Sequence, residues 1–271
     1  MAYVNFKSTV WSKYIQLELE QKAILADWCN KKFEGEAKHN ERVKILGVSK
    51  PTIGNYTGES IGTPETLRDT STYLMIDQAK YFNFMVDDVD KAQARPGLME
   101  ALMTEATRAM ALVRDKYIGT MALDAGNIST ATTVNSAASA KTAVDSAILA
   151  LREANVDLAS DVVLEIPWFV YKWLVDKLID LKTDNDELVK KGILGMYDGC
   201  YVRPTNNLHV SGSNYYAMVR TREAIAFAGG IDEVEAFRPE TLFSDAIKGL
   251  NTYGAKVVRP KELYTLIVKK N

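Results

Sequence analysis

The residues best suited to chemistry are the clustered carboxylates of Asp87-Asp88-Val89-Asp90. Carboxylate oxygens are the hard ligands that Mg²⁺ and Ca²⁺ prefer, so the cluster is a candidate cation site. It also comes shortly before a helix predicted to begin at Pro96, and acidic side chains there favour the helix dipole. Because no second group of carboxylates has a matching spacing, we favour the structural interpretation and predict no metal site.

Histidine and cysteine chemistry has few candidates, because His39, His209, Cys29 and Cys200 are the only such residues. The histidines lie outside metal-ligand spacing of each other and of the cysteines, which argues against zinc. The cysteines are typical of reduced thiols rather than of a disulfide framework. A histidine-dependent triad stays open, but the sequence has no GxSxG turn, no GxxxxGK[S/T] phosphate loop and no GxGxxG after a strand. We therefore predict no catalytic residue, no cofactor-binding residue and no cofactor.

Two weaker signals have ordinary structural explanations. Lys190-Lys191 could contact a phosphate, but a basic pair followed by glycine is typical of a helix C-terminus. The aromatic groups at 168–173 and 215–216 could stack on nucleic-acid bases, but burial in a core is the commoner explanation. Neither group defines an active site.

The composition of the 271 residues limits the classes of function. With 33 Lys and Arg against 35 Asp and Glu, the formal net charge is −2, which disfavours a tight, sequence-independent nucleic-acid binder. The sequence has no signal-peptide apolar region at its start and no apolar run long enough for a membrane span, so we predict no membrane partner.

In the N-terminal half, the sequence predicts an arm followed by two strands with a long connection between them. Residues 1–32 have an interrupted helix-like spacing that indicates an arm. Residues 42–45 alternate as a strand does, and 74–86 reads as a second, longer strand. The turn-rich region 47–71 between them is long for a compact domain. It predicts either a hairpin that projects toward a neighbouring molecule or a surface loop.

A long helix and a second unit follow. Apolar residues at helical spacing predict a helix over 96–121, and the Ser/Thr/Ala-rich stretch 125–143 indicates a boundary. The helices and strands beyond it predict an α/β unit; they are expected at 144–155, 161–166, 168–181, 201–202 and 215–219. In the tail we expect a short helix over 243–250 with Gly254 in its turn, and strands at 257–258 and 263–268.

Three segments carry a family resemblance. They are TSTYLMIDQAKYFNF at 70–84 with VDDVDKAQ at 86–93, GCYVRPTNNL at 199–208, and GLNTYGAKVVRP at 249–260. In this order they resemble major capsid proteins of tailed bacteriophages with the Hong Kong 97 phage capsid fold, over roughly residues 10–270.

The resemblance implies an α+β fold of the Hong Kong 97 phage-like major capsid type. Residues 1–32 would form the N-terminal arm, and 33–80 the extended loop that lies over a neighbour. Residues 81–142 and 222–271 would form a peripheral domain with the long helix as its spine. Residues 143–221 would form the axial domain, which points toward hexamer and pentamer centres.

The implied function is structural. The chain would self-assemble through hexamers and pentamers into the icosahedral shell that encloses a tailed-phage genome, a virion capsid built in the host bacterial cytoplasm. Because arm-like sequence starts within about ten residues of Met1, we expect a separate scaffolding protein. The resemblance also implies a portal protein and weak, non-specific contact with double-stranded DNA. Lys50 lies in the extended loop, but no pattern identifies a crosslinking partner, so we predict no crosslink.

Three alternatives stay open. With the same fold, the chain could form an encapsulin-like nanocompartment around a protein cargo. It could instead be a small α/β enzyme that uses residues 143–221, although the missing motifs argue against it. A nucleic-acid-binding module is the third alternative, and the net charge disfavours it.

Overall fold

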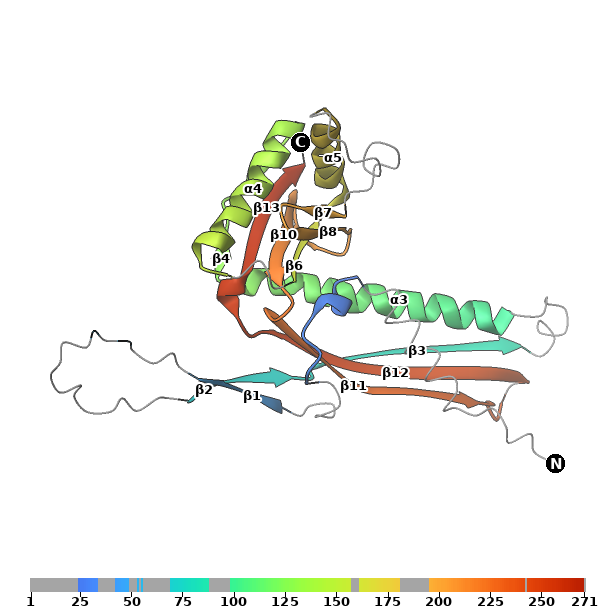
Figure 1. Cartoon of the computed structure of the whole chain (residues 1–271). Helices are drawn as coiled ribbons and strands as arrows, with labels where there is room; N and C mark the ends of the chain where they lie inside the picture. Colours follow the sequence, from blue (N-terminus) through green and yellow to red (C-terminus); the bar gives the residue numbers. More distant parts are fainter. Residues whose placement is uncertain are drawn as a thin grey trace.

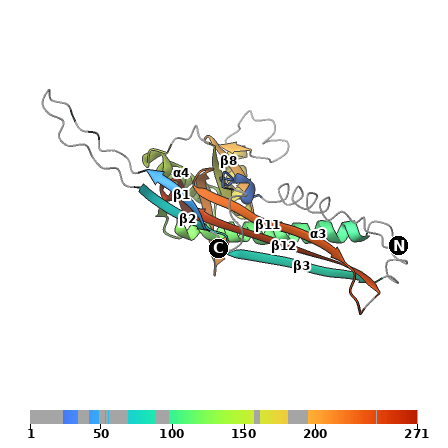
Figure 2. The same ribbon diagram turned by 90° about the horizontal axis from the view of Figure 1, so that it is seen from below.

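The computed structural model describes residues 24–33, 42–48, 53, 55, 69–87, 98–156, 161–180, 195–241 and 243–270. In these residues a long helix runs beside a narrow antiparallel sheet, a larger sheet with two helices stands at one end of that helix, and a hairpin extends beyond the same end (Figures 1 and 2).

The long helix, α3 (Leu98–Thr120), confirms the helix predicted at 96–121. It lies along a three-stranded sheet whose order is β11 (Ile225–Phe237), β12 (Ser244–Val257), β3 (Gln78–Asp87), all antiparallel. A separate apolar cluster joins helix and sheet; it contains Met103, Ala111 and Ile247, with Phe82, Phe84, Met110 and Val234 against it. The helix and sheet therefore form one elongated body.

The predicted short helix at 243–250 is wrong, because residues 244–250 lie in strand β12. The strand pairs with β3 on one side and β11 on the other, so sheet pairing determines its conformation. A short apolar run fits both periodicities, and tertiary context decides between them. Gly249 faces the ring of Phe82, where an added Cβ would lie only 2.3 Å from a ring carbon. The turn predicted at Gly254 is also wrong, because Gly254 lies within the same strand.

A hairpin of β1 (Arg42–Val48) and β2 (Asp69–Met75) lies beyond the body, antiparallel from Arg42↔Met75 to Val48↔Asp69. It confirms the strand predicted at 42–45 and the pairing of the two flanking strands. The predicted single strand 74–86 is divided, since β2 ends at Met75 and β3 begins at Gln78 in a different sheet. Most of the turn-rich connection between β1 and β2 falls outside the described ranges.

The break between β2 and β3 has a packing cause. Ile76 is buried with Leu74 in a cluster that includes Ala226 and Ala228 of β11. Strand β12 crosses at Gly254, where an added Cβ would lie 2.0 Å from the carbonyl oxygen of Met75. The chain thus passes from the hairpin sheet to the three-stranded sheet at the point where β2 packs closely on β12.

The larger sheet confirms the predicted α/β unit. Its order is β4 (Asn127–Ile128), β13 (Leu263–Lys270), β10 (Asn214–Thr221), β6 (Val162–Ile166), β8 (Cys200–Pro204), β7 (Met196–Tyr197), with β5 (Thr132–Val134) on β13 and β9 (His209–Ser211) on β10. Helices α4 (Ala137–Glu153) and α5 (Trp168–Asp180) cover one face, burying Ile148, Leu164, Leu174 and Val219 (Figure 1). Ser136 caps α4 by accepting the N–H of Ser139, so this helix starts earlier than predicted.

The C-terminal strand requires a correction. The resemblance implies that all of 222–271 belongs with the spine helix, whereas in the structure β13 pairs with β10 in the larger sheet. Leu266 and Val268 are buried in the core beneath α4, which holds the strand there. The chain turns toward it through the short 3-10 helix η3 (Pro260–Glu262). None of the described helices is both long and apolar enough to cross a membrane.

Candidate functional site: the N-terminal anchor and the exposed sheet face

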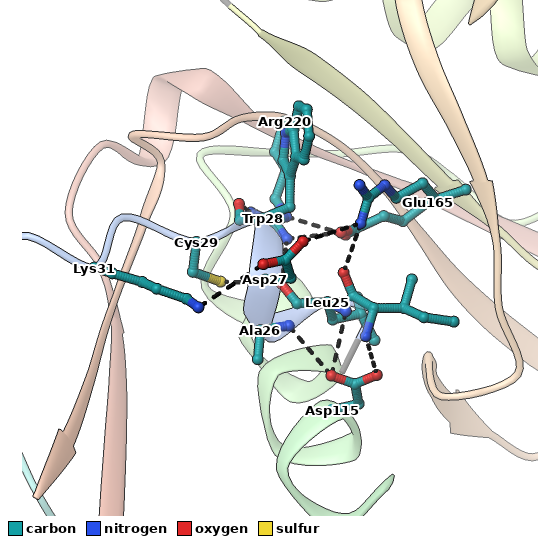
Figure 3. A network of polar contacts seen from close by, with 11 residues as sticks. Leu25, Ala26, Asp27, Trp28, Cys29, Lys31, Asp115, Glu165 and Arg220 are labelled. Atoms are coloured by element: carbon teal, nitrogen blue, oxygen red, sulfur yellow. Dashed lines mark hydrogen bonds and ion pairs between the residues drawn. The ribbon is translucent and has the colours of Figure 1, made fainter. Parts of the chain in front are cut away.

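Residues 24–30, which we call the anchored segment, lie where α3, the larger sheet and β11 meet (Figure 3). A short 3-10 helix, η1 (Ala26–Trp28), forms its centre. Leu25 and Cys29 are fully buried in an apolar cluster with residues of α3, β10 and β11. Asn30 extends the contact, because its N–H donates to the carbonyl of Ile225 at 2.9 Å and its carbonyl accepts the N–H of Phe227 at 2.9 Å. The segment is therefore fixed by its backbone as well as by its side chains.

The carboxylate of Asp115, on α3, receives the start of the segment. It accepts the N–H groups of Ile24 at 2.9 Å and of Leu25 and Ala26 at 3.2 Å. The side-chain amide of Asn207 donates to it at 3.3 Å. The first N–H groups of a helix have no partner within the helix, so this carboxylate satisfies them. Burial raises the pKa of Asp115, and the hydrogen bonds from the segment oppose that rise.

Arg220 and Glu165 form a buried ion pair beside the segment, on the side opposite Asp115 (Figure 3). The Nε and Nη2 groups of Arg220 donate to the two oxygens of Glu165 at 3.0 and 2.6 Å, and both side chains are fully buried. The same guanidinium donates to the carbonyl of Trp28 at 2.6 Å and to that of Leu25 at 3.1 Å. Burial raises the pKa of Glu165 and Arg220 opposes that rise, while Glu165 raises the pKa of Arg220 against the effect of burial. Two hydrogen bonds between the charged groups, with further hydrogen bonds to the remaining donors, offset the cost of removing a buried ion pair from water.

The rim of the anchored segment is polar and aromatic. The guanidinium of Arg203 lies over the Trp28 ring at 4.7 Å. The side-chain amide of Asn30 donates to Glu223 at 2.7 Å, and Lys32 donates to the other oxygen of Glu223 at 2.9 Å. The geometry holds a chain segment in place. It contains no nucleophile paired with a base, and no three His, Cys, Asp or Glu side chains gather for a metal anywhere in the described part of the chain.

The described residues cover only some of the candidate side chains from the sequence. His39, Asp88 and Lys190-Lys191 fall in stretches that the structure does not describe. His209 lies on β9 with its ring 4.9 Å from that of Tyr216.

The two cysteines and the aromatic residues singled out in the sequence are the remaining candidates. Cys29 and Cys200 are both free and buried, and they belong to separate apolar clusters. Tyr215 packs edge-on against Phe169 at 5.2 Å, in the core as expected, whereas Trp168 is half exposed. The expected burial therefore holds for Tyr215, which packs against the core, and is wrong for Trp168 and Trp173, which are exposed.

Sequence reasoning missed Asp115, Glu165 and Arg220. Two of them carry a readable signal, because Glu165 interrupts the apolar strand VVLEI and Arg220 lies in the mainly apolar strand NYYAMVRT. Charged residues at such positions are rarely fully buried unless they are paired. Asp115 has no such signal, since α3 carries several other charges.

A second feature is the face of the three-stranded sheet that points away from α3, which we call the outer sheet face. Tyr81 and Met85 of β3 are 79% and 59% exposed, and Leu250 lies opposite Tyr81 on β12. Alternate residues of β3, Phe82 and Phe84, pack toward α3 instead. Alternation along the strand thus separates a core face from an exposed face, on which Tyr81, Met85 and Leu250 are apolar and Asn83 and Lys248 are polar. Neighbouring exposed apolar side chains of this kind mark contact surfaces.

The family model for phage capsid proteins matches residues 69–266, from the start of β2 into β13. The chain belongs to the phage capsid protein family. The anchored segment and the outer sheet face are therefore features of a structural, shell-forming subunit rather than of an enzyme.

Solved capsid structures share the whole architecture. A structure from Mycobacterium phage Che8 is 29% identical, with a TM-score of 0.75 over 90% of each chain. The capsid structure of cyanophage P-SCSP1u is 15% identical, with a TM-score of 0.72 over 92% of this chain and 88% of that chain. These similarities confirm the expected Hong Kong 97 phage-like capsid fold and the role of the chain as a homo-oligomeric capsid protein of the virion.

The same fold also occurs in a virus-like particle from Pyrococcus furiosus, which is 14% identical with a TM-score of 0.61 over 96% of this chain and 99% of that chain. At this identity the similarity concerns the fold alone. No curated protein sequence matches this one.

Proposed function

We propose that this capsid protein assembles through hexamers and pentamers into the icosahedral shell of a tailed phage. The observation that carries the proposal is the outer sheet face, where Tyr81 and Met85 stand exposed in a subunit whose family forms shells. Burial of apolar surface drives association at about 25 cal/mol per Å². Identical subunits that give and receive different surfaces close into rings.

The proposed division of the chain follows the resemblance, with one revised boundary. Residues 1–32 act as the arm, which departs from the anchored segment, and 33–80 act as the extended loop. The spine α3 and the three-stranded sheet form the peripheral domain. We assign β13, at 263–270, to the axial domain together with 143–221, because its pairing with β10 supports that grouping.

Partners beyond the shell are part of the same proposal. Assembly in the host bacterial cytoplasm would use a separate scaffolding protein, and a portal protein would complete the particle. A subunit with a formal net charge of −2 suits weak, non-specific contact with packaged double-stranded DNA. Co-purification of particles with nucleic acid would support a phage shell, whereas an enclosed enzyme would favour the nanocompartment alternative.

Substitution of the outer sheet face tests the proposal. In the double variant Tyr81→Ser and Met85→Ser, the folded subunit should keep its stability because both side chains are exposed. If they are buried between subunits, the loss of about 1.4 kcal/mol or more per contact should raise the critical concentration for assembly about tenfold or more. Sedimentation velocity across a concentration series measures this change.

Leu112→Ser on α3 is the control, because this side chain is 42% exposed and lies on the long helix rather than on the outer sheet face or in 143–221. Equal assembly by the double variant and the wild type would contradict the role of the outer sheet face.

A further inference from the structure

The η1 turn is held at both ends by buried side chains of opposite charge (Figure 3). At its start, Asp115 accepts N–H groups of the segment. At its end, Arg220 donates to the carbonyl of Trp28, and the same guanidinium also donates to the carbonyl of Leu25, the residue just before the turn. This placement suits the helix dipole, in which unpaired N–H groups at the start are positive and unpaired carbonyls at the end are negative. A turn of three residues is too short to be stable by itself, so its partners determine its position.

Glu165 gives the Arg220 guanidinium a fixed direction. By taking Nε and one Nη2 hydrogen, it leaves the remaining donors of the rigid fork directed at the segment. An ion pair that only strengthened the β6–β10 pairing would need no bond to residues 24–30. Here two of its four hydrogen bonds reach backbone carbonyls some 190 positions earlier in the sequence.

The connection joins parts of the subunit that have separate cores. Glu165 and Arg220 belong to strands whose other faces pack under α4 and α5. The segment packs in a different cluster, against α3, β11 and the opposite face of the larger sheet at Met218 of β10. Loss of its polar attachments would therefore release the segment while the core of the larger sheet stays intact.

We propose that Asp115 and Arg220, the latter oriented by Glu165, are positioning residues that fix where the N-terminal arm leaves the subunit body. Their effect on the subunit does not depend on assembly. Their effect on the shell rests on the proposed role of residues 1–32 as an arm that contacts a neighbour.

The two cysteines provide a test within the native protein. Cys29 lies in the anchored segment, donates to the carbonyl of Leu25 at 3.3 Å and is fully buried. Cys200 lies on β8, fully buried in the core of the larger sheet. Labelling by iodoacetamide followed by mass spectrometry thus reports release of the segment at Cys29 and opening of the body at Cys200. Burial raises the pKa of each thiol to about 11, so both should label slowly until their surroundings open.

The principal variant is Glu165→Met with Arg220→Met, which removes the donors without leaving a charge unpaired. Replacing a whole buried ion pair by apolar residues of similar size is often neutral for the fold. We expect Cys29 to label about tenfold faster than in the wild type, as a loss of ~1.4 kcal/mol in segment attachment would produce, with Cys200 unchanged. An unchanged Cys29, or an equal rise at both cysteines, would overturn the proposal.

Two further variants test the proposal independently: one removes the other polar attachment of the segment, and one removes an ion pair that does not contact the segment. Asp115→Asn keeps the size of the side chain but replaces one acceptor oxygen by a donor, and it should raise Cys29 labelling selectively. Arg259→Met with Glu262→Met removes a more exposed Arg–Glu pair of 3.0 Å whose other bond is to Thr221, and it should leave Cys29 unchanged.

Assembly of the same variants separates this inference from the proposed function. Selective release of Cys29 with a lower yield of closed particles supports both. Release of Cys29 with a normal yield supports positioning of the segment and contradicts a role for the arm in assembly.

Discussion

At the residue scale, the buried carboxyl of Asp115 links stability to acidity. Burial raises its pKa above the ordinary 3.8, so the native protein holds this proton more tightly than the unfolded chain does. Between those two pKa values the group therefore adds stability as pH falls and loses it as pH rises. This direction is opposite to that of an ordinary exposed carboxylate in an ion pair, whose native pKa is lowered.

Comparison of the wild type with Asp115→Asn isolates this effect. We expect the free energy of unfolding of the wild type, minus that of the variant, to increase as pH is lowered toward 3.8. Urea unfolding followed by circular dichroism at several pH values gives the difference. A difference that decreases over that range would show that the native pKa of Asp115 is lowered instead.

The residue scale also shows where sequence reasoning stops. Cys29 and Cys200 are free and buried in separate apolar clusters. The partners of Glu165 and Arg220 were not predictable, since the pair is separated by 55 positions and its two carbonyl acceptors come from the N-terminal region. A charge within an apolar strand signals a partner, but the fold alone identifies that partner.

At the element scale, Gly254 controls how the hairpin meets the body. Because an added Cβ would lie 2.0 Å from the Met75 carbonyl oxygen, Gly254→Ala must move backbone rather than a flexible side chain. Overpacking of this kind costs about 1–3 kcal/mol, so the urea midpoint should fall accordingly. Gly229→Ala on β11 is the control, because nothing lies within 4 Å of its added Cβ and it should be close to neutral. Equal midpoints for the two variants would contradict the close packing of β2 on β12.

Helices and strands were predicted correctly where one spacing of the apolar residues, helical or strand-like, dominates the segment. The spine α3 shows helical spacing over many turns, and β6 is a short β-branched run, so both were predicted close to their bounds. The prediction failed for 243–250, where pairing with two neighbours produces a strand. It also failed at Ile76, because the change of sheet depends on β12 crossing the chain at Gly254.

At the scale of the whole molecule, the elongated body and the hairpin beyond it suit a subunit that needs neighbours (Figure 1). Membership of the phage capsid protein family and structural similarity to Che8 over 90% of each chain establish the shell-forming role. Sequence motifs predicted this fold through family resemblance. The outer sheet face and the anchor, by contrast, depend on which side of each strand meets α3, and that became visible only in three dimensions.

The most direct test is the size of the particles that the purified chain forms, alone and with a candidate scaffolding protein, by sedimentation velocity and negative-stain electron microscopy. We predict rings, tubes or closed shells, with closed shells favoured when the scaffold is present. A compact monomer under every condition would contradict assembly as the function of this chain.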